Sequence, residues 1–286
     1  MKFKIVFQLL RVKHYVKNLF VFAPLFFSFT FITDNVIKSI IAFFLFSFSA
    51  SSIYILNDLK DIDYDRLHPQ KKHRPIPSGK IKPNEAKLIS ILLTLFSFGV
   101  ALILNFNFFI ILLTYYLMNL AYTYKLKDFP VIDIIIISIG FVLRLLAGSS
   151  VVSIPLSSWI ILITFLLALF LALGKRRDEF LLLSSGKKIR KNINFYNQKK
   201  IEFSLIIISV LILFSYFIFV SLTETINKFG SDVTYSTIFV IVGFIRYYYL
   251  IFIKKYYADP TELLGKDYLL KIIIALWVFS YYFILR

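Results

Sequence analysis

The side chains best suited to chemistry in this 286-residue sequence are carboxylates, in the stretch Asn57-Asp58-x-x-Asp61-x-x-x-Asp65. Acidic residues are scarce, only 16 in the chain, and this group follows directly on a long apolar segment. If a helix continues one or two turns past that segment, the three aspartates occupy positions i, i+3 and i+7 and share one face. Like charges on one face repel, so we expect a cation between them.

The ligand chemistry of this group favours a hard cation. Carboxylate oxygens without thiolate or imidazole neighbours suit Mg²⁺ above all, particularly where a phosphate is the co-ligand. The chain contains no cysteine, which excludes disulfides and thiolate-bound metals. The alternative is a solvated salt-bridge network between these acids and the basic residues that follow.

A second polar stretch, from Tyr122 to Asp133, precedes another apolar segment and includes Tyr124, Lys127 and Asp128. Asp133 begins that segment, and Arg144 follows 11 residues later, about three helical turns on and on nearly the same face. A deeply placed arginine needs a partner or a polar cavity, so it indicates a site. A structural ion pair for Arg144 and a helix-capping role for Asp128 remain the alternatives.

Two basic stretches accompany the acids. The first, from Arg66 to Gly79, contains three prolines, which predict a constrained loop. The second is Gly174-Lys175-Arg176-Arg177, at the end of an apolar segment, and it lacks the pattern of a P-loop. Each cation alone is typical of a membrane-topology signal. Acids and rigid basic loops together suggest a diphosphate leaving group held through a metal and cations.

The elements that position these residues are apolar helices. The chain is 59% hydrophobic and 17% charged, against about 45–50% and 25% in soluble domains. The apolar residues form blocks that approach the roughly 20 residues needed to cross a bilayer as a helix. We expect an all-α, polytopic membrane protein forming a single domain over residues 1–286. Its nine predicted spans are 18–32, 37–57, 85–104, 107–122, 131–150, 156–174, 202–222, 234–252 and 268–285.

The basic residues orient these spans. All but five of the 33 lysines and arginines fall in the amino-terminal segment or in alternate loops, the side that cytoplasmic loops occupy. The exceptions are Lys38, Arg144, Lys228, Arg246 and Arg286. We therefore expect a cytoplasmic amino terminus and an external carboxyl terminus. The net charge of +17 then reflects topology over anionic lipid and does not indicate nucleic-acid binding.

The acidic motif resembles the first aspartate-rich motif of the UbiA-type intramembrane prenyltransferase superfamily. Further similarities point to its polyprenyl-phosphate phosphoribosyltransferase branch. The stretches that carry them are His14-Tyr15-x-Lys17-Asn18, His68-Pro69-x-Lys71-x-x-Arg74-Pro75-Ile76, Lys127-Asp128-x-Pro130-Val131-x-Asp133, Gly140-Phe141-x-x-Arg144, Gly174-Lys175-Arg176 and Asp259-Pro260-x-Glu262. The resemblance covers nearly the whole chain and implies nine helices around a central cavity open to the cytoplasm. One departure is the spacing of Asp128 and Asp133, five residues apart instead of the DxxxD of many aromatic prenyltransferases.

The resemblance also implies roles for individual residues. The metal ligands would be Asp58, Asp61 and Asp65, with Asp133 completing the catalytic set. Arg144 would meet the lipid phosphate. The implied substrate-binding residues are Lys17, Asn18, Asn57, Lys71, Arg74, Tyr124, Lys127, Asp128, Arg144, Lys175 and Arg176.

Three functions are consistent with these features. The first is Mg²⁺-dependent transfer of a 5-phosphoribosyl group from phosphoribosyl pyrophosphate to a polyprenyl phosphate, in cell-envelope biosynthesis at a bacterial cytoplasmic membrane. The second is transfer of a prenyl group from a prenyl diphosphate to an aromatic or other acceptor. The third is transport of an anionic solute, although transporters more often show repeated halves and helices broken at mid-membrane. The sequence does not indicate an oligomeric state.

Overall fold

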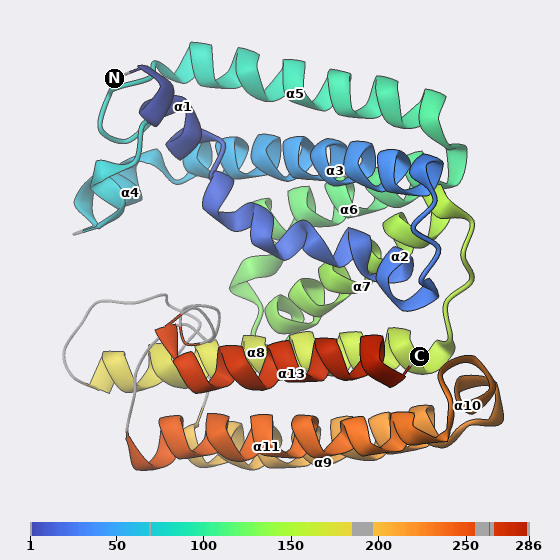
Figure 1. Ribbon diagram of the computed structural model, residues 1–286. Coiled ribbons are helices and arrows are strands. Elements are labelled where there is room, and N and C mark those ends of the chain that lie inside the picture. Colours follow the sequence, from blue (N-terminus) through green and yellow to red (C-terminus); the bar gives the residue numbers. More distant parts are fainter. Residues whose placement is uncertain (1, 69, 185–196, 255–262, 264–265, 285–286) are drawn as a thin grey trace. The chain divides into compact units, whose positions relative to one another are not determined.

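A computed structural model describes residues 2–68, 70–184, 197–254, 263 and 266–284, and the regular elements in these ranges are all helices (Figure 1). The chain divides into two compact units, one of residues 1–127 and 139–156, the other of residues 128–138 and 157–286. The division falls inside one long helix, which contributes to both units. The single membrane domain remains a prediction.

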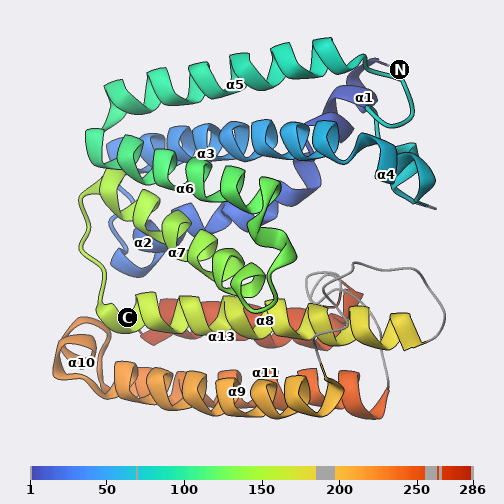
Figure 2. The same ribbon diagram turned by 180° about the vertical axis from the view of Figure 1, so that it is seen from behind.

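The first unit is arranged around its longest helix, α3, which packs against α5, α6 and the segment η1 (Figure 2). Its core joins apolar side chains of these helices to α7, with the rings of Phe46 and Tyr115 4.4 Å apart. The elements are α1 (Lys2–Leu9), η1 (Val12–Phe22), α2 (Ala23–Ser28), α3 (Thr33–Lys60), α4 (Ile62–Leu67), η2 (Lys71–His73), α5 (Pro83–Leu104), α6 (Phe106–Tyr124), η3 (Leu126–Asp128) and α7 (Ile132–Val152).

Local sequence explains where several of these helices begin. Pro83 is the first residue of α5, where its missing N–H costs nothing, and Glu85 accepts a hydrogen bond from the Lys82 N–H at 3.2 Å. The side chain of Asn105 accepts from the Phe108 N–H at 2.9 Å at the start of α6. The cap at Asn105 separates α5 from α6, although both helices are apolar.

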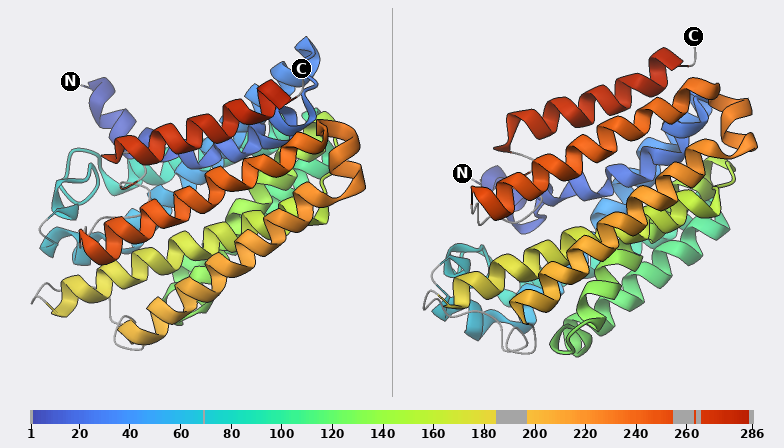
Figure 3. Two further views of the ribbon diagram at one scale, coloured as in Figure 1. Left: turned by 60° about the horizontal axis from the view of Figure 1, so that its bottom comes forward. Right: turned by 90° about the horizontal axis from the view of Figure 1, so that it is seen from below.

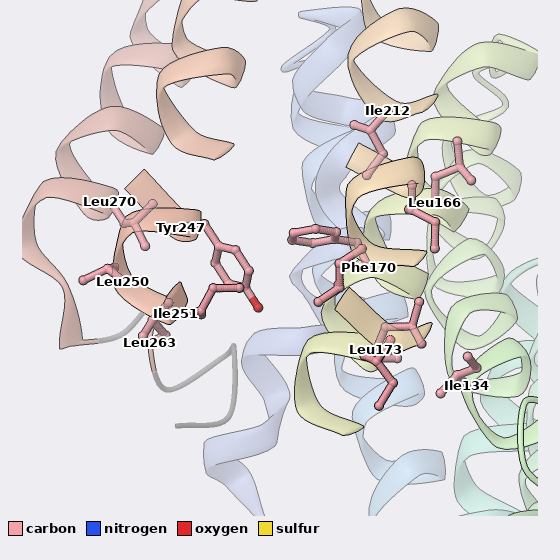
Figure 4. Packing of buried hydrophobic residues seen from close by; sticks show 14 residues of the cluster. Ile134, Leu166, Phe170, Leu173, Ile212, Tyr247, Leu250, Ile251, Leu263 and Leu270 are labelled. Carbon is pink, nitrogen blue, oxygen red and sulfur yellow. The ribbon is translucent and has the colours of Figure 1, made fainter. Parts of the chain in front are cut away.

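In the second unit the long helices α8, α9, α11 and α13 run alongside one another (Figure 3). Phe170 of α8 points toward Tyr247 of α11, with ring centroids 5.0 Å apart (Figure 4). The elements are α8 (Ser158–Ser184), α9 (Gln198–Ser221), α10 (Thr223–Phe229), η5 (Ser231–Ser236), α11 (Thr237–Tyr248), the π-helical turn η6 (Tyr249–Ile253) and α13 (Tyr268–Ile284).

Seven helices in the described part of the chain are long and apolar enough to span a membrane, and a shorter apolar helix covers Tyr268–Tyr281. Eight of the nine predicted segments coincide with helical structure. The first, residues 18–32, is not matched by one long apolar helix, because this part of the chain is divided between η1 and the six-residue α2. The chain is an integral membrane protein, and the count of nine spans is not confirmed.

Gly148 of α7 lies directly against the backbone of η1. A Cβ added there would overlap the carbonyl group of Val21 in η1 and lie 3.1 Å from a side-chain atom of Pro24. We expect Gly148→Ala to lower the free energy of unfolding by about 1–3 kcal/mol, because the backbone must move. Thermal unfolding in detergent would measure the loss.

Gly99 provides the matched control, since nothing lies within 4 Å of a Cβ at that helical position. Gly99→Ala should be neutral or stabilising by up to about 1 kcal/mol. Equal melting temperatures for the two variants would mean that η1 does not pack against α7 at Gly148.

Candidate functional site

The acidic motif spans a break between two helices. α3 ends at Lys60 and α4 begins at Ile62, while Asp61 between them has the non-helical angles φ −95° and ψ 13°. The continuous helix on which a shared face of the three aspartates depended is thus interrupted at Asp61, although the Asp65 N–H still donates to the Asp61 carbonyl oxygen at 2.8 Å. Asp58 and Asp65 are buried, at 3% and 2% exposure, whereas Asp61 is only partly buried.

Asp58 and Asp65 nevertheless converge on one cation. A single nitrogen of Arg74, Nη1, donates to Asp58 Oδ1 at 2.9 Å and to Asp65 Oδ2 at 2.7 Å. The Lys71 ammonium lies 3.6 Å from the other Asp65 oxygen. The cation expected from like-charge repulsion is thus supplied by the loop of residues 71–74.

Arg11 also belongs to this cluster. From the sequence it is interpreted only as one of the basic residues that orient the protein in the membrane. Its guanidinium is ion-paired with Asp58 Oδ1 and lies 4.7 Å from the centroid of the Tyr54 ring. The backbone of Arg11 is left-handed, with φ 51° and ψ 45°, which is unfavourable for a residue other than glycine. The pair joins residues 47 positions apart, so no local pattern reveals it.

His68 organises the loop that carries Arg74. Its Nδ1 accepts the backbone N–H groups of Gln70 at 3.2 Å and Lys71 at 3.3 Å, which requires an unprotonated nitrogen. Partial burial lowers the pKa of His68, and the charges of Lys71 and Arg74 lower it further. The neutral imidazole therefore stabilises this turn at neutral pH.

Asp61 faces a different element. Lys127 Nζ donates to both of its carboxylate oxygens, at 2.9 and 2.8 Å. The neighbouring Lys60 ammonium donates to the carbonyl oxygens of Thr123 at 2.8 Å and Tyr124 at 2.6 Å, and it lies 5.0 Å from the centroid of the Tyr124 ring. These bonds join the end of α3 to the end of α6, where a cation is favourable.

Two other predicted substrate contacts, Asn18 and Arg144, bind each other. Arg144 is 5% exposed and donates to Asn18 Oδ1 at 2.7 Å, to the Gly140 carbonyl at 2.6 Å and to the Tyr115 hydroxyl at 2.9 Å. Asn18 in turn donates to Ser47 Oγ at 2.9 Å. These contacts give the buried cation neutral hydrogen-bond acceptors, so Arg144 is held by protein groups other than the ion pair considered as the alternative.

The predicted phosphate-binding cations of the second unit lie inside α8, where Arg176 and Arg177 are buried and Lys175 is half-buried. This helix continues to Ser184, so the prediction that a loop begins at Lys175 is wrong. Arg176 is ion-paired with Asp133 at 2.9 Å and with Glu179. Arg177 pairs with Glu202 at 3.1 Å and donates to the carbonyl oxygen of Ile251 in the π-helical turn at 3.3 Å.

The remaining predicted site residues are more accessible. Lys17 on η1, Asn57 on α3 and Lys175 on α8 are half-buried, and Asp128 is exposed at the end of η3. Asn57 accepts the Asp61 N–H through its carbonyl oxygen at 3.0 Å. The motif Asp259-Pro260-x-Glu262, Pro69 and the basic residues Lys187, Lys188, Arg190 and Lys191 lie outside the described residues.

The carboxylates have the chemistry of a Mg²⁺ site, because their donors are all oxygen. Asp58 and Asp65 already share one positively charged partner. Asp61 does not join them, and in the described ranges no three histidine or acidic side chains are grouped closely enough to hold a metal. The arrangement therefore brings two carboxylate ligands together, Asp58 and Asp65. Asp61 lies between α3 and α4 and faces Lys127.

The sequence of this chain is similar to those of known proteins. The model of the UbiA prenyltransferase family matches residues 19–272. The chain is 31% identical to the decaprenyl-phosphate phosphoribosyltransferase of Mycolicibacterium smegmatis, over 86% of this chain and 79% of that protein. It is 32% identical to the enzyme of the same name from Corynebacterium glutamicum, over 94% and 83%.

A solved structure has the same fold. It is a UbiA homologue from Archaeoglobus fulgidus bound to DMAPP and Mg²⁺, with a TM-score of 0.72 and 20% identity, covering 98% of both chains.

Proposed function

Because the chain belongs to the UbiA prenyltransferase family and is a transferase, we propose that it moves a 5-phosphoribosyl group from phosphoribosyl pyrophosphate to a polyprenyl phosphate, with Mg²⁺ as cofactor. The observation that carries the proposal is the convergence of Asp58 and Asp65 on one cationic nitrogen. It occurs in a chain 31–32% identical to two decaprenyl-phosphate phosphoribosyltransferases over most of its length.

In the proposed reaction, the bond between ribose C1 and the diphosphate oxygen breaks, and a bond from C1 to an oxygen of the lipid phosphate forms. The diphosphate leaves with the bonding electrons. Asp58 and Asp65, which converge, would hold Mg²⁺, which when bound neutralises charge on the leaving diphosphate. Asp61, which faces Lys127, is proposed as a further ligand of the same ion. Lys71 and Arg74, which lie against Asp58 and Asp65, would bind diphosphate oxygens through charge-assisted hydrogen bonds.

The other predicted residues divide into two groups. Asn18, Asp133, Arg144 and Arg176 hold one another in buried pairs, so we propose that they position helices. Lys17, Asn57, Tyr124, Lys127, Asp128 and Lys175 remain proposed substrate contacts. The protein would act in a bacterial cytoplasmic membrane, as the bacterial sources of the similar enzymes suggest.

A direct assay tests the proposal. Purified protein would be incubated with labelled phosphoribosyl pyrophosphate and a polyprenyl phosphate, with Mg²⁺ or with a chelator. We expect a labelled lipid only with Mg²⁺. Product from a prenyl diphosphate and an aromatic acceptor, with none from phosphoribosyl pyrophosphate, would assign the chain to prenyl transfer.

Neutralising Lys71 should weaken donor binding. We expect Lys71→Met to raise the apparent donor KM about 10- to 100-fold, the equivalent of about 1.5–3 kcal/mol for a charge-assisted contact. Lys72→Met is the control, because Lys72 is adjacent but exposed. The same KM in both variants would mean that the loop charges only orient the protein in the membrane.

The predicted orientation is testable because the native chain has no cysteine. We expect residues 66–80 and 187–198 to be cytoplasmic and residues 226–232 to be external, following the distribution of basic residues. Lys72→Cys and Lys228→Cys place single thiols at exposed positions of η2 and α10. A membrane-impermeant maleimide added to intact cells should label only the Lys228→Cys variant. Labelling of the Lys72→Cys variant would contradict the predicted orientation.

A further inference from the structure

A cavity of about 660 Å³ adjoins the acidic cluster in the first unit. One wall is the amino-terminal segment, including Lys4, Arg11 and Lys13, and the other includes Asp58, His73 and Arg74. Its volume is in the range of small-molecule sites. The cavity therefore extends the candidate site beyond the carboxylates.

The charges around this cavity do not balance. Among the described residues that line it there are four lysine and arginine side chains and one carboxylate, Asp58. Arg11 and Arg74 already share that carboxylate, so Lys4 and Lys13 add positive charge that it does not match. An excess of one sign in a concave surface attracts ligands of the other sign, and the cavity is suited to an anion.

The amino-terminal wall is held in place by packing. Leu9 at the end of α1 is 2% exposed and belongs to a cluster with Ile55, Ile76 and Ile81. Two residues later, the left-handed backbone of Arg11 turns the chain from α1 into η1. Such a conformation is unfavourable for a residue other than glycine and persists where the surroundings enforce it. Arg11 is thereby directed at Asp58, linking the cavity to the acids.

We propose that this cavity binds a phosphate monoester separate from the leaving diphosphate, through Lys4 and Lys13 together with Arg11. The inference rests on the proposed function, in which two groups have this chemistry: the 5-phosphate of the donor and the headgroup of the polyprenyl phosphate. Both carry about 1.5 to 2 negative charges near neutral pH, which suits a group of lysines and an arginine. Phe7 also lines the cavity, and it is 56% exposed, so one rim is apolar.

Equilibrium binding to the purified full chain tests the inference without requiring turnover. The probes are ribose 5-phosphate and a short-chain polyprenyl phosphate, each titrated against the wild type, Lys4→Met, Lys13→Met and the double variant. Each single change should weaken one probe about 10-fold, as expected for loss of a charge-assisted contact. Lys87→Met is the control, because Lys87 is an exposed lysine on α5 that does not line the cavity.

The probe that responds identifies the source of the phosphate. Selective weakening of ribose 5-phosphate assigns the cavity to the donor, and selective weakening of the lipid probe assigns it to the acceptor. Unchanged affinity for both probes, or equal competition by the phosphodiester phosphatidylglycerol, would overturn the inference. If the protein transfers phosphoribosyl groups but the lysine variants bind both probes as the wild type does, the inference alone is rejected. If the lysine variants bind a probe more weakly but the wild type shows no phosphoribosyl transfer, the proposed function alone is rejected.

Discussion

Asp61→Asn is expected to lower kcat/KM about 10²- to 10³-fold, because a metal ligand contributes several kcal/mol to stabilising charge in the transition state. Stability should change little. The Asp61–Lys127 pair is partly exposed, with side-chain exposures of 25% and 16%, and such pairs contribute about 0–1 kcal/mol. Measuring kcat/KM as a function of Mg²⁺ concentration, together with the melting temperature, checks both expectations.

Lys127→Met is the matched control, because it breaks the same ion pair and retains the carboxylate. If Asp61 holds Mg²⁺, only Asp61→Asn should raise the Mg²⁺ concentration needed for half-maximal activity. Because Lys127 is itself a proposed substrate contact, the Mg²⁺ dependence is the readout that separates the two roles. An unchanged Mg²⁺ dependence in both variants would mean that Asp61 acts only through its ion pair with Lys127 of η3.

Asp61 is a clearer test than Asp58. Asp58 is 3% exposed and pairs with both Arg11 and Arg74. Its replacement by asparagine removes the carboxylate that pairs with the half-buried Arg11 and leaves Arg74 with Asp65, which should destabilise this cluster. A loss of activity in Asp58→Asn would therefore combine loss of a metal ligand with loss of structure.

Asp133→Asn is expected to destabilise the protein by about 3–5 kcal/mol, because it leaves the buried guanidinium of Arg176 without this carboxylate. The two side chains are 0% and 2% exposed and their charged atoms are 2.9 Å apart. Arg176→Met should have a comparable effect for the reciprocal reason. Thermal unfolding in detergent would measure each loss.

The double variant separates a structural pair from two substrate contacts. Asp133→Asn combined with Arg176→Met should lose less stability than the sum of the single changes, because no member of the pair remains unmatched. Asp34→Asn is the control, since its pair with Lys38 is exposed and should contribute little. An increase in donor KM with unchanged melting temperatures would restore the substrate-binding roles that the sequence implied.

The amino-acid sequence by itself determined the membrane-embedded helical class and the association of two motifs. The apolar blocks of α3, α5, α6, α7, α8 and α9 are local properties, because each segment must satisfy its own backbone hydrogen bonds in lipid. The family resemblance likewise placed the loop of residues 71–74 and the acids in one site. Lys71 and Arg74 do lie against Asp58 and Asp65.

Only the tertiary structure decided how the charges are paired. Arg11 and Asp58 are 47 residues apart and Arg144 and Asn18 are 126 apart, and in each case burial is compensated by a partner from a distant element. Arg176 looked like a phosphate ligand because a basic run ends an apolar segment, yet α8 continues and its partner is Asp133. A sequence records that a side chain is charged, whereas its partner is set by which helices pack together, since burying a charge is favourable only where the fold supplies the opposite one.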